Sequence, residues 1–554
     1  MKSQVVLIDC ENFTLAERTL AAVLQGVVNR SGPKVFLVNG CNSWISSLRT
    51  DKVSPAAFSD GFTETYPSTD HIWLTELSRY GFEFVKTSLY DAICAFKSEF
   101  RGLLRFDEIS RHTAALTACG LYDLLPVDEE THQKYAAALD GLKVEIDYTG
   151  QFADPLEAQG YAVTNLLEKT TDEFVSSYFC EAENSTLQSD YAVMKRAFCY
   201  DLNHVTASNL SHAEDEAKSY SKRDEELLIP ILNHVKPFGF LWGWGRGGEN
   251  AIASITAERG IVLLCANMPN ASFFAGIPAS GKKLAQRRAE PAKIKAENKM
   301  YIAFMVNEGD TYKSAATFWN FGSWHHTVAH RDLKINWGVD GLVFRLFPFL
   351  HSYFYENATD SDYFFSATTA YGYIHPDFLR KDLIFPYAEK VREMLEFTDT
   401  KYFDPWWFSV RDETGEERKW DFLAATGAKG ITQWNSANTT LYEGGVPIIC
   451  SDLYYPFSKA FGKDNGERAK VIANTLMTAR EKQGADRPFC TVVYGGDPYA
   501  FSLIAEALPK EKFEIVRLDE LFAIANHSKD LLTGLSAEYD LKGDVGSWDP
   551  TSAQ

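Results

Sequence analysis

Residues 363–376, with the sequence YFFSATTAYGYIHP, begin as a buried strand and end in aromatic and turn-forming residues. The first half combines aromatic, small and β-branched residues, a composition typical of a strand that is covered on both faces. Pro376 has no N–H to donate and therefore ends the strand. In a (β/α)8 barrel, the side chains at the carboxyl ends of the strands form the site. The stretch therefore predicts a barrel strand that opens onto a functional site.

Similar apolar runs recur on both sides of this stretch and alternate with helical patterns. The strand-like runs are 238–244, 261–266, 300–306, 333–337, 363–368, 402–410, 430–434, 446–450 and 489–494. The clearest helical patterns are 384–397, 467–483 and 499–507. Nearly all-apolar strands that alternate with helices are required by a parallel sheet buried on both faces. We therefore predict an α/β fold with a carboxyl-terminal (β/α)8 TIM-like barrel over 229–530, with an open doubly wound sheet as the alternative.

The amino-terminal part predicts a second α/β region. A short strand at 5–8, a helical pattern at 15–28 and a strand at 34–38 form a βαβ-like opening. No GxGxxG follows the first strand, which argues against a dinucleotide site. We expect residues 1–228 to form this region, in more than one small subdomain, and residues 531–554 to form a carboxyl-terminal tail.

Composition restricts the class of protein further. The chain has 554 residues, 45% of them hydrophobic, and a formal net charge of −20, so it predicts several cores and argues against a nucleic-acid partner. No apolar run is long enough to cross a bilayer, and no signal peptide is visible at the amino terminus. Nine cysteines without CxxC spacing indicate reduced thiols. These features predict a cytoplasmic protein, although a secreted protein trimmed of its leader gives the same pattern.

The end of the first stretch, Ala370 to Pro376, resembles the signature of the GxGYxYP family of glycoside hydrolases. Gly372, Tyr373 and Pro376 keep their places, whereas Ala370 replaces the first glycine of the signature and His375 replaces its second tyrosine. Residues 20–38, LAAVLQGVVNRSGPKVFLV, are similar to the opening of the same family's amino-terminal region. The resemblance implies a barrel-like carboxyl-terminal domain and a carbohydrate substrate.

Two carboxylates stand close together after the strand that ends at Val306, in the turn Asn307-Glu308-Gly309-Asp310-Thr311. Close carboxylates raise one another's proton affinity, so one can stay protonated as an acid while the other stays charged. The family resemblance points to Asp310 at this turn. The alternative is a capping turn in which Asp310 or Thr311 closes the following helix.

Asp340 and Asp452 also follow apolar strands, and each is predicted to be either a helix cap or a catalytic group. Hydrolysis of a glycosidic bond commonly uses a pair of carboxylates on opposite sides of the bond. The resemblance implies a glycoside hydrolase, and its candidate catalytic residues are Glu308, Asp310, Asp340 and Asp452.

Aromatic, amide and basic residues at the strand ends are candidates for sugar binding, because an indole fits the apolar C–H face of a sugar. These candidates are Trp242, Trp244, Arg246, Asn267, Asn336, Trp337, Tyr371, Tyr373, His375 and Gln433. Five residues are predicted to share one concave mouth: Trp244, Asp310, Trp337, Tyr373 and Asp452. No HExxH motif is present and no acidic partner accompanies His325, His326 and His330, so we expect neither a metal nor a cofactor.

Two other classes of function remain open at this point. The altered signature suits a carbohydrate-binding protein whose barrel no longer catalyses. A sugar lyase or deacetylase would use His375 as its base. No GxSxG motif indicates a serine nucleophile.

Overall fold

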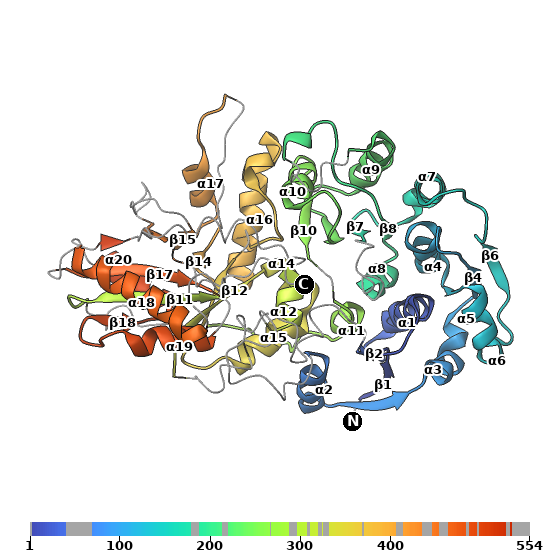
Figure 1. Cartoon of the computed structure of the whole chain (residues 1–554), viewed down its shortest axis with the longest axis horizontal. Helices are drawn as coiled ribbons and strands as arrows, with labels where there is room; N and C mark the ends of the chain where they lie inside the picture. Colours follow the sequence, from blue (N-terminus) through green and yellow to red (C-terminus); the bar gives the residue numbers. More distant parts are fainter. Residues whose placement is uncertain are drawn as a thin grey trace.

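The computed structural model describes the following residues: 3–39, 69–178, 188–212, 220–265, 268–286, 296–306, 311–318, 324, 332–367, 370–405, 414–434, 446–451, 453, 464–482, 487–495, 498–527 and 532–533. Figure 1 shows an elongated molecule with the amino-terminal sheets at one end and a curled carboxyl-terminal sheet at the other. Within the described residues, no helix is long and apolar enough to span a membrane.

The first sheet has the order β2-β1-β3 and is parallel throughout. Its elements are β1 (Ser3–Asp9), α1 (Leu15–Val28), β2 (Val35–Val38), α2 (Thr69–Arg79), β3 (Phe82–Thr87) and α3 (Leu89–Phe96). A capping box starts α1, since the Thr14 hydroxyl accepts from Glu17 N and the Glu17 carboxylate accepts from Thr14 N. The predicted βαβ opening is therefore present, with the apolar residues of α1 buried.

A second parallel sheet has the order β5-β4-β6. It contains β4 (Gly102–Arg105), α4 (Leu116–Tyr122), β5 (Leu124–Val127), α5 (Glu129–Lys134), α6 (Ala136–Leu139) and β6 (Val144–Asp147). The third sheet follows, with the order β10-β9-β7-β8. It contains α7 (Pro155–Asn165), β7 (Phe174–Ser177), α8 (Ser189–Lys195), β8 (Phe198–Tyr200), α9 (Lys222–His234), β9 (Phe240–Gly243), α10 (Glu249–Ala257), β10 (Val262–Leu264) and α11 (Ala271–Ala275).

The predicted strands at 238–244 and 261–266 are present as β9 and β10, but they belong to this third sheet and not to the curled sheet. β9 pairs with β7 in the register Phe174 to Phe240, and the rings of these two residues stack 4.5 Å apart. An apolar run indicates a buried strand without indicating its partner, which is why the sequence placed these two strands in the wrong sheet.

The carboxyl-terminal sheet is nine-stranded, with the order β16-β15-β14-β13-β12-β11-β17-β19 and with β18 beside β11. Its strands are β11 (Met300–Val306), β12 (Ile335–Val339), β13 (Asp362–Ser366), β14 (Tyr402–Phe403), β15 (Gly430–Trp434), β16 (Ile448–Ser451), β17 (Phe489–Tyr494), β18 (Phe513–Ile515) and β19 (Leu532–Thr533). Every pairing is parallel. The curl brings the end of β17 to the chain after β16, where Tyr494 N donates to Leu453 O over 3.0 Å. The predicted TIM-like parallel sheet is thus confirmed.

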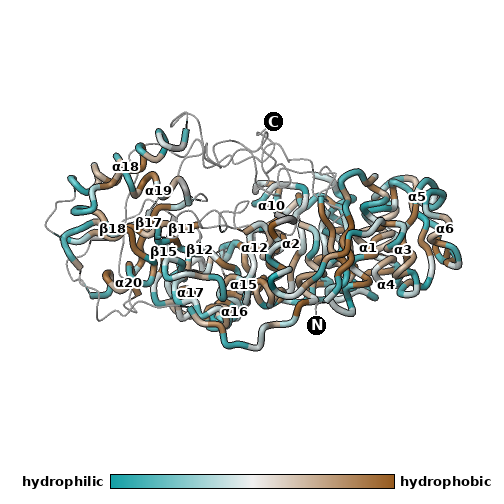
Figure 2. Tube along the Cα trace, turned by 90° about the horizontal axis from the view of Figure 1, so that it is seen from below, coloured by the Kyte–Doolittle hydropathy of each residue, from teal (hydrophilic) through white to brown (hydrophobic). Residues whose placement is uncertain are grey.

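Alternate residues of the strands pack on the two faces of this sheet. Met300, Ile302 and Phe304 belong to the large core shared with the surrounding helices, whereas Tyr301 and Ala303 belong to a smaller core inside the curl. The helices are α12 (Thr311–Ala316), α14 (Gly341–Leu346), α15 (Pro348–Asn357), α16 (Ile384–Phe397), α17 (Lys419–Ala425), α18 (Asn465–Lys482), α19 (Pro498–Ala507) and α20 (Leu518–His527). Figure 2 shows hydrophobic residues concentrated along β11 and β17.

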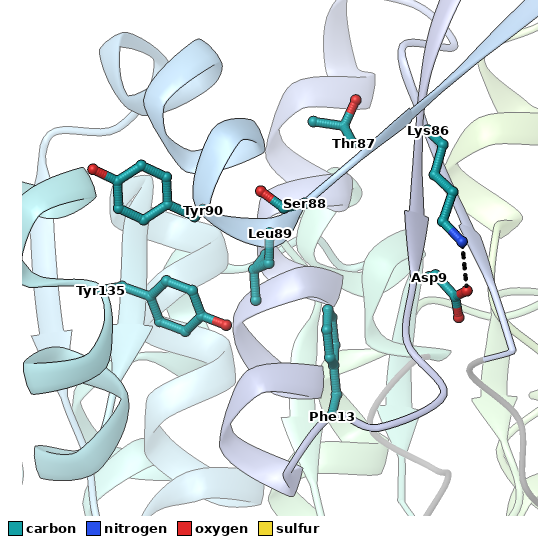
Figure 3. A pocket seen from close by; sticks show the side chains of 8 residues that line it. All are labelled: Asp9, Phe13, Lys86, Thr87, Ser88, Leu89, Tyr90 and Tyr135. Atoms are coloured by element: carbon teal, nitrogen blue, oxygen red, sulfur yellow. Dashed lines mark hydrogen bonds and ion pairs between the residues drawn. The ribbon is translucent and has the colours of Figure 1, made fainter.

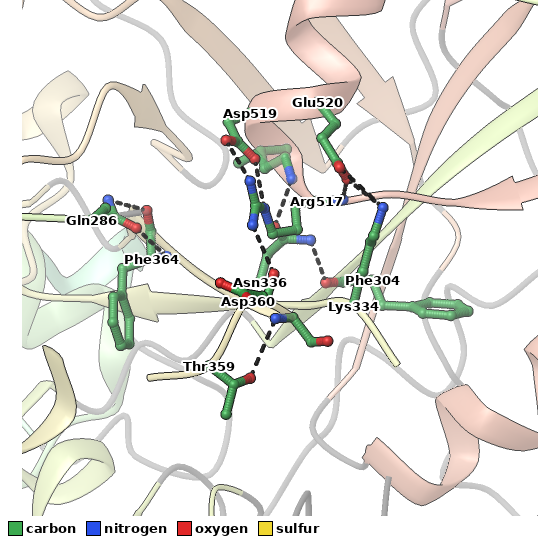
Figure 4. A network of polar contacts seen from close by, with 12 residues as sticks. Gln286, Phe304, Lys334, Asn336, Thr359, Asp360, Phe364, Arg517, Asp519 and Glu520 are labelled. Atoms are coloured by element: carbon green, nitrogen blue, oxygen red, sulfur yellow. Dashed lines mark hydrogen bonds and ion pairs between the residues drawn. The ribbon is translucent and has the colours of Figure 1, made fainter. Parts of the chain in front are cut away.

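The helix α20 supplies much of the inner core, and a polar network fixes its first turn to the sheet (Figure 4). Asn336 on β12 accepts from Leu518 N over 2.7 Å, and the Arg517 guanidinium pairs with Asp519. Lys334 donates to Glu520 over 2.8 Å. The network joins the chain at the start of β12 to the start of α20.

Candidate active site

The signature loop leaves β13 and packs against the edge of the third sheet. Leu263 N donates to Tyr373 O over 2.7 Å, and Tyr373 N donates to Leu263 O over 2.8 Å. Ala370 and Gly372 both have left-handed backbones, with φ of 66° and 67°. A Cβ atom on residue 372 would lie 2.5 Å from Val262 Cγ2. Glycine at 372 therefore permits the close approach of the loop to β10.

Asp340 holds the signature loop against the barrel. Its Oδ1 accepts from Val343 N over 2.9 Å and caps α14, and its Oδ2 accepts from Gly372 N over 2.8 Å. Burial raises the pKa of Asp340 to about 6, although both hydrogen bonds oppose the rise. Because each oxygen accepts from a backbone N–H, the observed contacts make Asp340 a cap and a positioning group.

A hydrogen-bonded set of three side chains joins the loop to the first turn of α10. The Tyr373 hydroxyl donates to Glu249 Oε1, and His375 Nε2 lies 2.5 Å from the same hydroxyl oxygen. Tyr373 is buried, while Glu249 is exposed as the first residue of α10. A helix N-terminus favours a carboxylate at that position. An accessible carboxylate is thus held in place by a buried tyrosine.

Burial shifts the pKa values of Tyr373 and His375 in opposite directions. The pKa of Tyr373 lies well above its usual value, chiefly because of burial and then because of Glu249. Burial lowers the pKa of His375, although Asp377 and Glu249 oppose the shift. The imidazole is therefore neutral near pH 7 and donates from Nε2 when Tyr373 donates to Glu249. The three side chains form one continuous chain of hydrogen bonds.

Glu249 was not predicted from the sequence. Its partner Tyr373 lies 124 residues further along the chain, a separation that no local pattern spans. The available signal was an acidic residue directly after Gly247 and Gly248, at the start of a helical pattern that follows an apolar strand.

The predicted residues Glu308, Asp310, Asp452 and Asn267 lie outside the described residues, as do His325, His326 and His330. The chain directly after the acidic turn is described. The Thr311 hydroxyl donates to Cys265 O over 3.5 Å, and Lys313 N donates to the same oxygen over 3.0 Å. Cys265 directly follows β10, so α12 begins beside the strand that also holds Tyr373.

Three further predicted residues belong to the loops around this junction. Arg246 follows β9 and pairs with Asp201 over 2.8 Å, and its neighbour Trp244 is half-buried. The Tyr371 hydroxyl donates to Phe238 O over 2.9 Å. These contacts bring Tyr373 and His375 together, whereas Arg246 is bonded to Asp201, which follows β8, and Tyr371 to Phe238, which precedes β9.

Comparisons with known proteins agree with this architecture. Residues 298–526 match the domain described as "GxGYxYP putative glycoside hydrolase C-terminal domain", and residues 4–60 match "GxGYxYP_N 1st domain". The chain belongs to the GxGYxYP family. The resemblance predicted from the signature and from residues 20–38 is thereby confirmed.

Two solved structures were also compared with this GxGYxYP protein. A crystal structure of "a putative hydrolase from Bacteroides thetaiotaomicron VPI-5482" aligns with a TM-score of 0.72 and 15% identity over 95% of both chains, which shows a shared fold. A "putative polysaccharide deacetylase from Mycobacterium smegmatis" aligns with a TM-score of only 0.30 and 10% identity, over 47% of this chain and 100% of that chain. No curated protein sequence matches the chain.

Two predicted tryptophans of this family member are fully buried. Trp242 donates from Nε1 to Gln188 O over 3.3 Å, and Trp337 donates from Nε1 to Asp362 Oδ1 over 2.9 Å. Both indoles pack among other rings, such as Tyr312 for Trp242. Their contacts are those of core residues, so Trp337 does not line an open mouth.

Two predicted amides are also engaged inside the protein. Asn336 donates to Phe304 O over 2.9 Å and accepts from Leu518 N, which fixes α20. Gln433 accepts from Lys419 Nζ over 3.0 Å beside α17. Within the described residues, no group of three or more His, Cys, Asp and Glu side chains could hold a metal ion.

Proposed function

We propose that this GxGYxYP protein hydrolyses a glycosidic bond with two carboxylates, Glu249 and Asp310. The observation that carries the proposal is the set Glu249–Tyr373–His375, in which the family signature holds an exposed carboxylate beside the end of β10. The contact between Thr311 and Cys265 supports Asp310 as the second group, because Thr311 directly follows Asp310 in the chain.

The two carboxylates would have different roles. The hydrogen bond from Tyr373 fixes the orientation of the Glu249 carboxylate, which suits a nucleophile or a general base. Only Gly309 separates Asp310 from Glu308 in the chain. Repulsion between two close carboxylates favours the protonated form of one of them, which suits a catalytic acid. Asp310 would then protonate the leaving oxygen, while neutral His375 keeps the Tyr373 hydroxyl directed at Glu249.

The test is hydrolysis of an oligosaccharide panel by Glu249→Gln and Asp310→Asn, with release of reducing ends as the readout. Loss of a catalytic acid or base lowers turnover by about a hundredfold to ten-thousandfold. Glu258→Gln is the matched control, because Glu258 is an exposed glutamate at the other end of α10. Melting temperatures should stay close to that of the wild type. Normal turnover by folded Glu249→Gln would exclude the proposed role of Glu249.

A sugar lyase is the second candidate, because the neutral imidazole of His375, which donates from Nε2 to the Tyr373 hydroxyl, keeps Nδ1 unprotonated as a base for proton abstraction. A lyase yields an unsaturated product, whereas a hydrolase yields a new reducing end without unsaturation. A deacetylase instead releases acetate. Sugar binding without any product would indicate a carbohydrate-binding protein, so the same incubations separate all four.

A further inference from the structure

A cavity of about 410 Å³ lies in the first sheet, away from the signature loop, at the carboxyl ends of β1 and β3. Asp9 is the last residue of β1, Thr87 is the last residue of β3, and Tyr90 belongs to the first turn of α3. Phe13 and Tyr135 complete this part of the lining (Figure 3). The volume is that of a site for a small molecule.

The parallel sheet explains why a ligand site is expected at this place. In the order β2-β1-β3, β1 and β3 are neighbouring parallel strands, so their carboxyl ends meet at one edge of the sheet. Open parallel sheets bind ligands outside the carboxyl ends of their strands, which is where the cavity lies.

The polar side of the cavity is a fixed carboxylate. Asp9 accepts from Asn39 Nδ2 over 2.9 Å and from Lys86 Nζ over 3.2 Å. Burial raises the pKa of Asp9, but the hydrogen bonds from Asn39, Glu11 N and Lys86 outweigh it and hold the pKa below its usual value. Asp9 is therefore charged at neutral pH and can accept hydrogen bonds from hydroxyl groups.

Aromatic rings form the apolar side of the cavity, as Figure 3 shows for Phe13, Tyr90 and Tyr135. The Tyr135 hydroxyl donates to Glu17 Oε1 over 2.5 Å, and Lys134 donates to the same oxygen, so this ring is fixed in orientation. Tyr90 is 41% exposed at the entrance. Rings of this kind match the C–H faces of a sugar.

The charges of the cavity argue against a phosphate ligand. Among the described residues that line it, the cation is Lys86, which already pairs with Asp9. The first turn of α3 is also closed, because Ser88 accepts from Asp91 N and donates to the Asp91 carboxylate. A phosphate would be repelled by the negative charge of Asp9, whereas a neutral polyol would not be.

We propose that this cavity at the carboxyl ends of β1 and β3 binds a neutral sugar and is a second carbohydrate site of the protein. Asp9 would accept from sugar hydroxyls, and Lys86 would donate to a sugar oxygen. Tyr90 and Phe13 would contact the ring of the sugar. The choice of a sugar rests on the proposed function, whereas the location rests on the first sheet alone.

The experiment measures binding of four neutral disaccharides, cellobiose, maltose, lactose and N,N′-diacetylchitobiose, to the full chain by saturation-transfer NMR and calorimetry. Asp9→Asn and Tyr90→Ala should each weaken the binding of a bound disaccharide by about tenfold or more. Tyr220→Ala is the matched control, because Tyr220 is also 41% exposed but lies elsewhere. Unchanged binding by both cavity variants, or no binding of any of the four, would overturn the proposal.

Binding measurements on the Glu249→Gln variant test this proposal independently of the proposed function. In Glu249→Gln, disaccharide binding should persist and should still be lost on adding Asp9→Asn. If Glu249→Gln alone abolishes all binding, the cavity assignment is wrong while the active-site proposal stands. If no variant or wild-type protein hydrolyses any glycan but the cavity variants lose binding, the proposed function fails and the cavity proposal stands.

Discussion

At the scale of single residues, the signature loop depends on backbone conformations that side chains rarely adopt. Ala370 has φ of 66° and is fully buried at the position where the family signature has its first glycine. A left-handed conformation costs an L-residue about 1–2 kcal/mol, a strain that surrounding contacts such as the bond from Gly341 N to Ala370 O must offset. Residue 372 needs glycine more strictly than residue 370 does. A side chain at 372 would have a left-handed backbone, and its Cβ would also overlap with Val262.

Gly372→Ala should therefore destabilise the protein more than the same change at an open left-handed glycine. Gly150 has φ of 66° and nothing within 4 Å of the added Cβ, so Gly150→Ala reports strain alone, about 1 kcal/mol. In Gly372→Ala, the overlap of the new Cβ with Val262 should lower the free energy of unfolding by about 1–3 kcal/mol more. Urea unfolding midpoints of the two variants measure the difference. Equal midpoints would contradict the close packing of the loop on β10.

Buried histidines predict how stability changes with pH. His204 bonds to the Tyr200 hydroxyl, and burial lowers its pKa to about 4. Below pH 6.5 the unfolded chain binds a proton that the folded protein does not bind until about pH 4, so folding stability falls as the pH decreases. At pH 5 this cost reaches about 2 kcal/mol for one such group.

The variant His204→Gln tests this dependence, because it removes the titrating group. It should be less stable than the wild type at pH 7.5, and the gap between their melting temperatures should narrow toward pH 5. The exposed His527→Gln serves as the control and should keep a constant gap. A gap for His204→Gln that stays constant from pH 7.5 to pH 5 would show that His204 is not held neutral.

At the scale of elements, caps connect helices to the strands and loops around them. The Thr14–Glu17 box starts α1 and also fixes Tyr135 through the Glu17 carboxylate. Asp340 starts α14 and at the same time holds Gly372. A single carboxylate can thus set the position of a loop that local sequence leaves undefined.

Asp340→Asn should destabilise the protein at pH 7.5 without abolishing turnover. Its amide retains one acceptor for Val343 N but presents an NH2 group to Gly372 N, which leaves a buried donor unsatisfied at a cost of about 1–3 kcal/mol. Asp128→Asn is the control, because Asp128 caps α5 alone and asparagine caps equally well. A large loss of turnover with an unchanged melting temperature would instead make Asp340 catalytic.

At the scale of the whole molecule, side chains connect the sheets into one body. Asn270 pairs with β2 like an added strand, since its Oδ1 accepts from Leu37 N and its Nδ2 donates to Leu37 O. Trp73 on α2 donates to Ala316 O over 2.7 Å and stacks 4.2 Å from Phe318. The amino-terminal sheet is thereby joined to both the third sheet and the barrel.

Trp73→Ala should loosen the first sheet from the barrel and lower stability by about 3–5 kcal/mol, because Trp73 is only 2% exposed. Limited proteolysis should then cut the amino-terminal part at lower protease concentrations than in the wild type. Trp420→Ala is the control, since Trp420 is 38% exposed and should change stability little. Equal proteolysis patterns for the two variants would show that this contact does not hold the sheets together.

Much of the secondary structure could be predicted from the sequence. The strand at 300–306 and the helix at 384–397 have the same bounds in the structure as in the prediction, and the run at 430–434 forms β15. Burial on both faces and helical spacing are properties of consecutive residues, so local sequence reports them directly. The signature likewise identified the family and the loop that carries Tyr373 and His375.

The partners of these elements were decided only by the tertiary structure. The sequence could not show that β9 and β10 join β7, nor that Glu249 meets Tyr373 across 124 residues, because contacts between distant residues depend on how the chain packs. Likewise, Trp337 and Asn336 follow the pattern of strand-end ligands in the sequence but are core residues in the fold. Local sequence determines what each element can bury, and packing determines which polar groups remain exposed for chemistry.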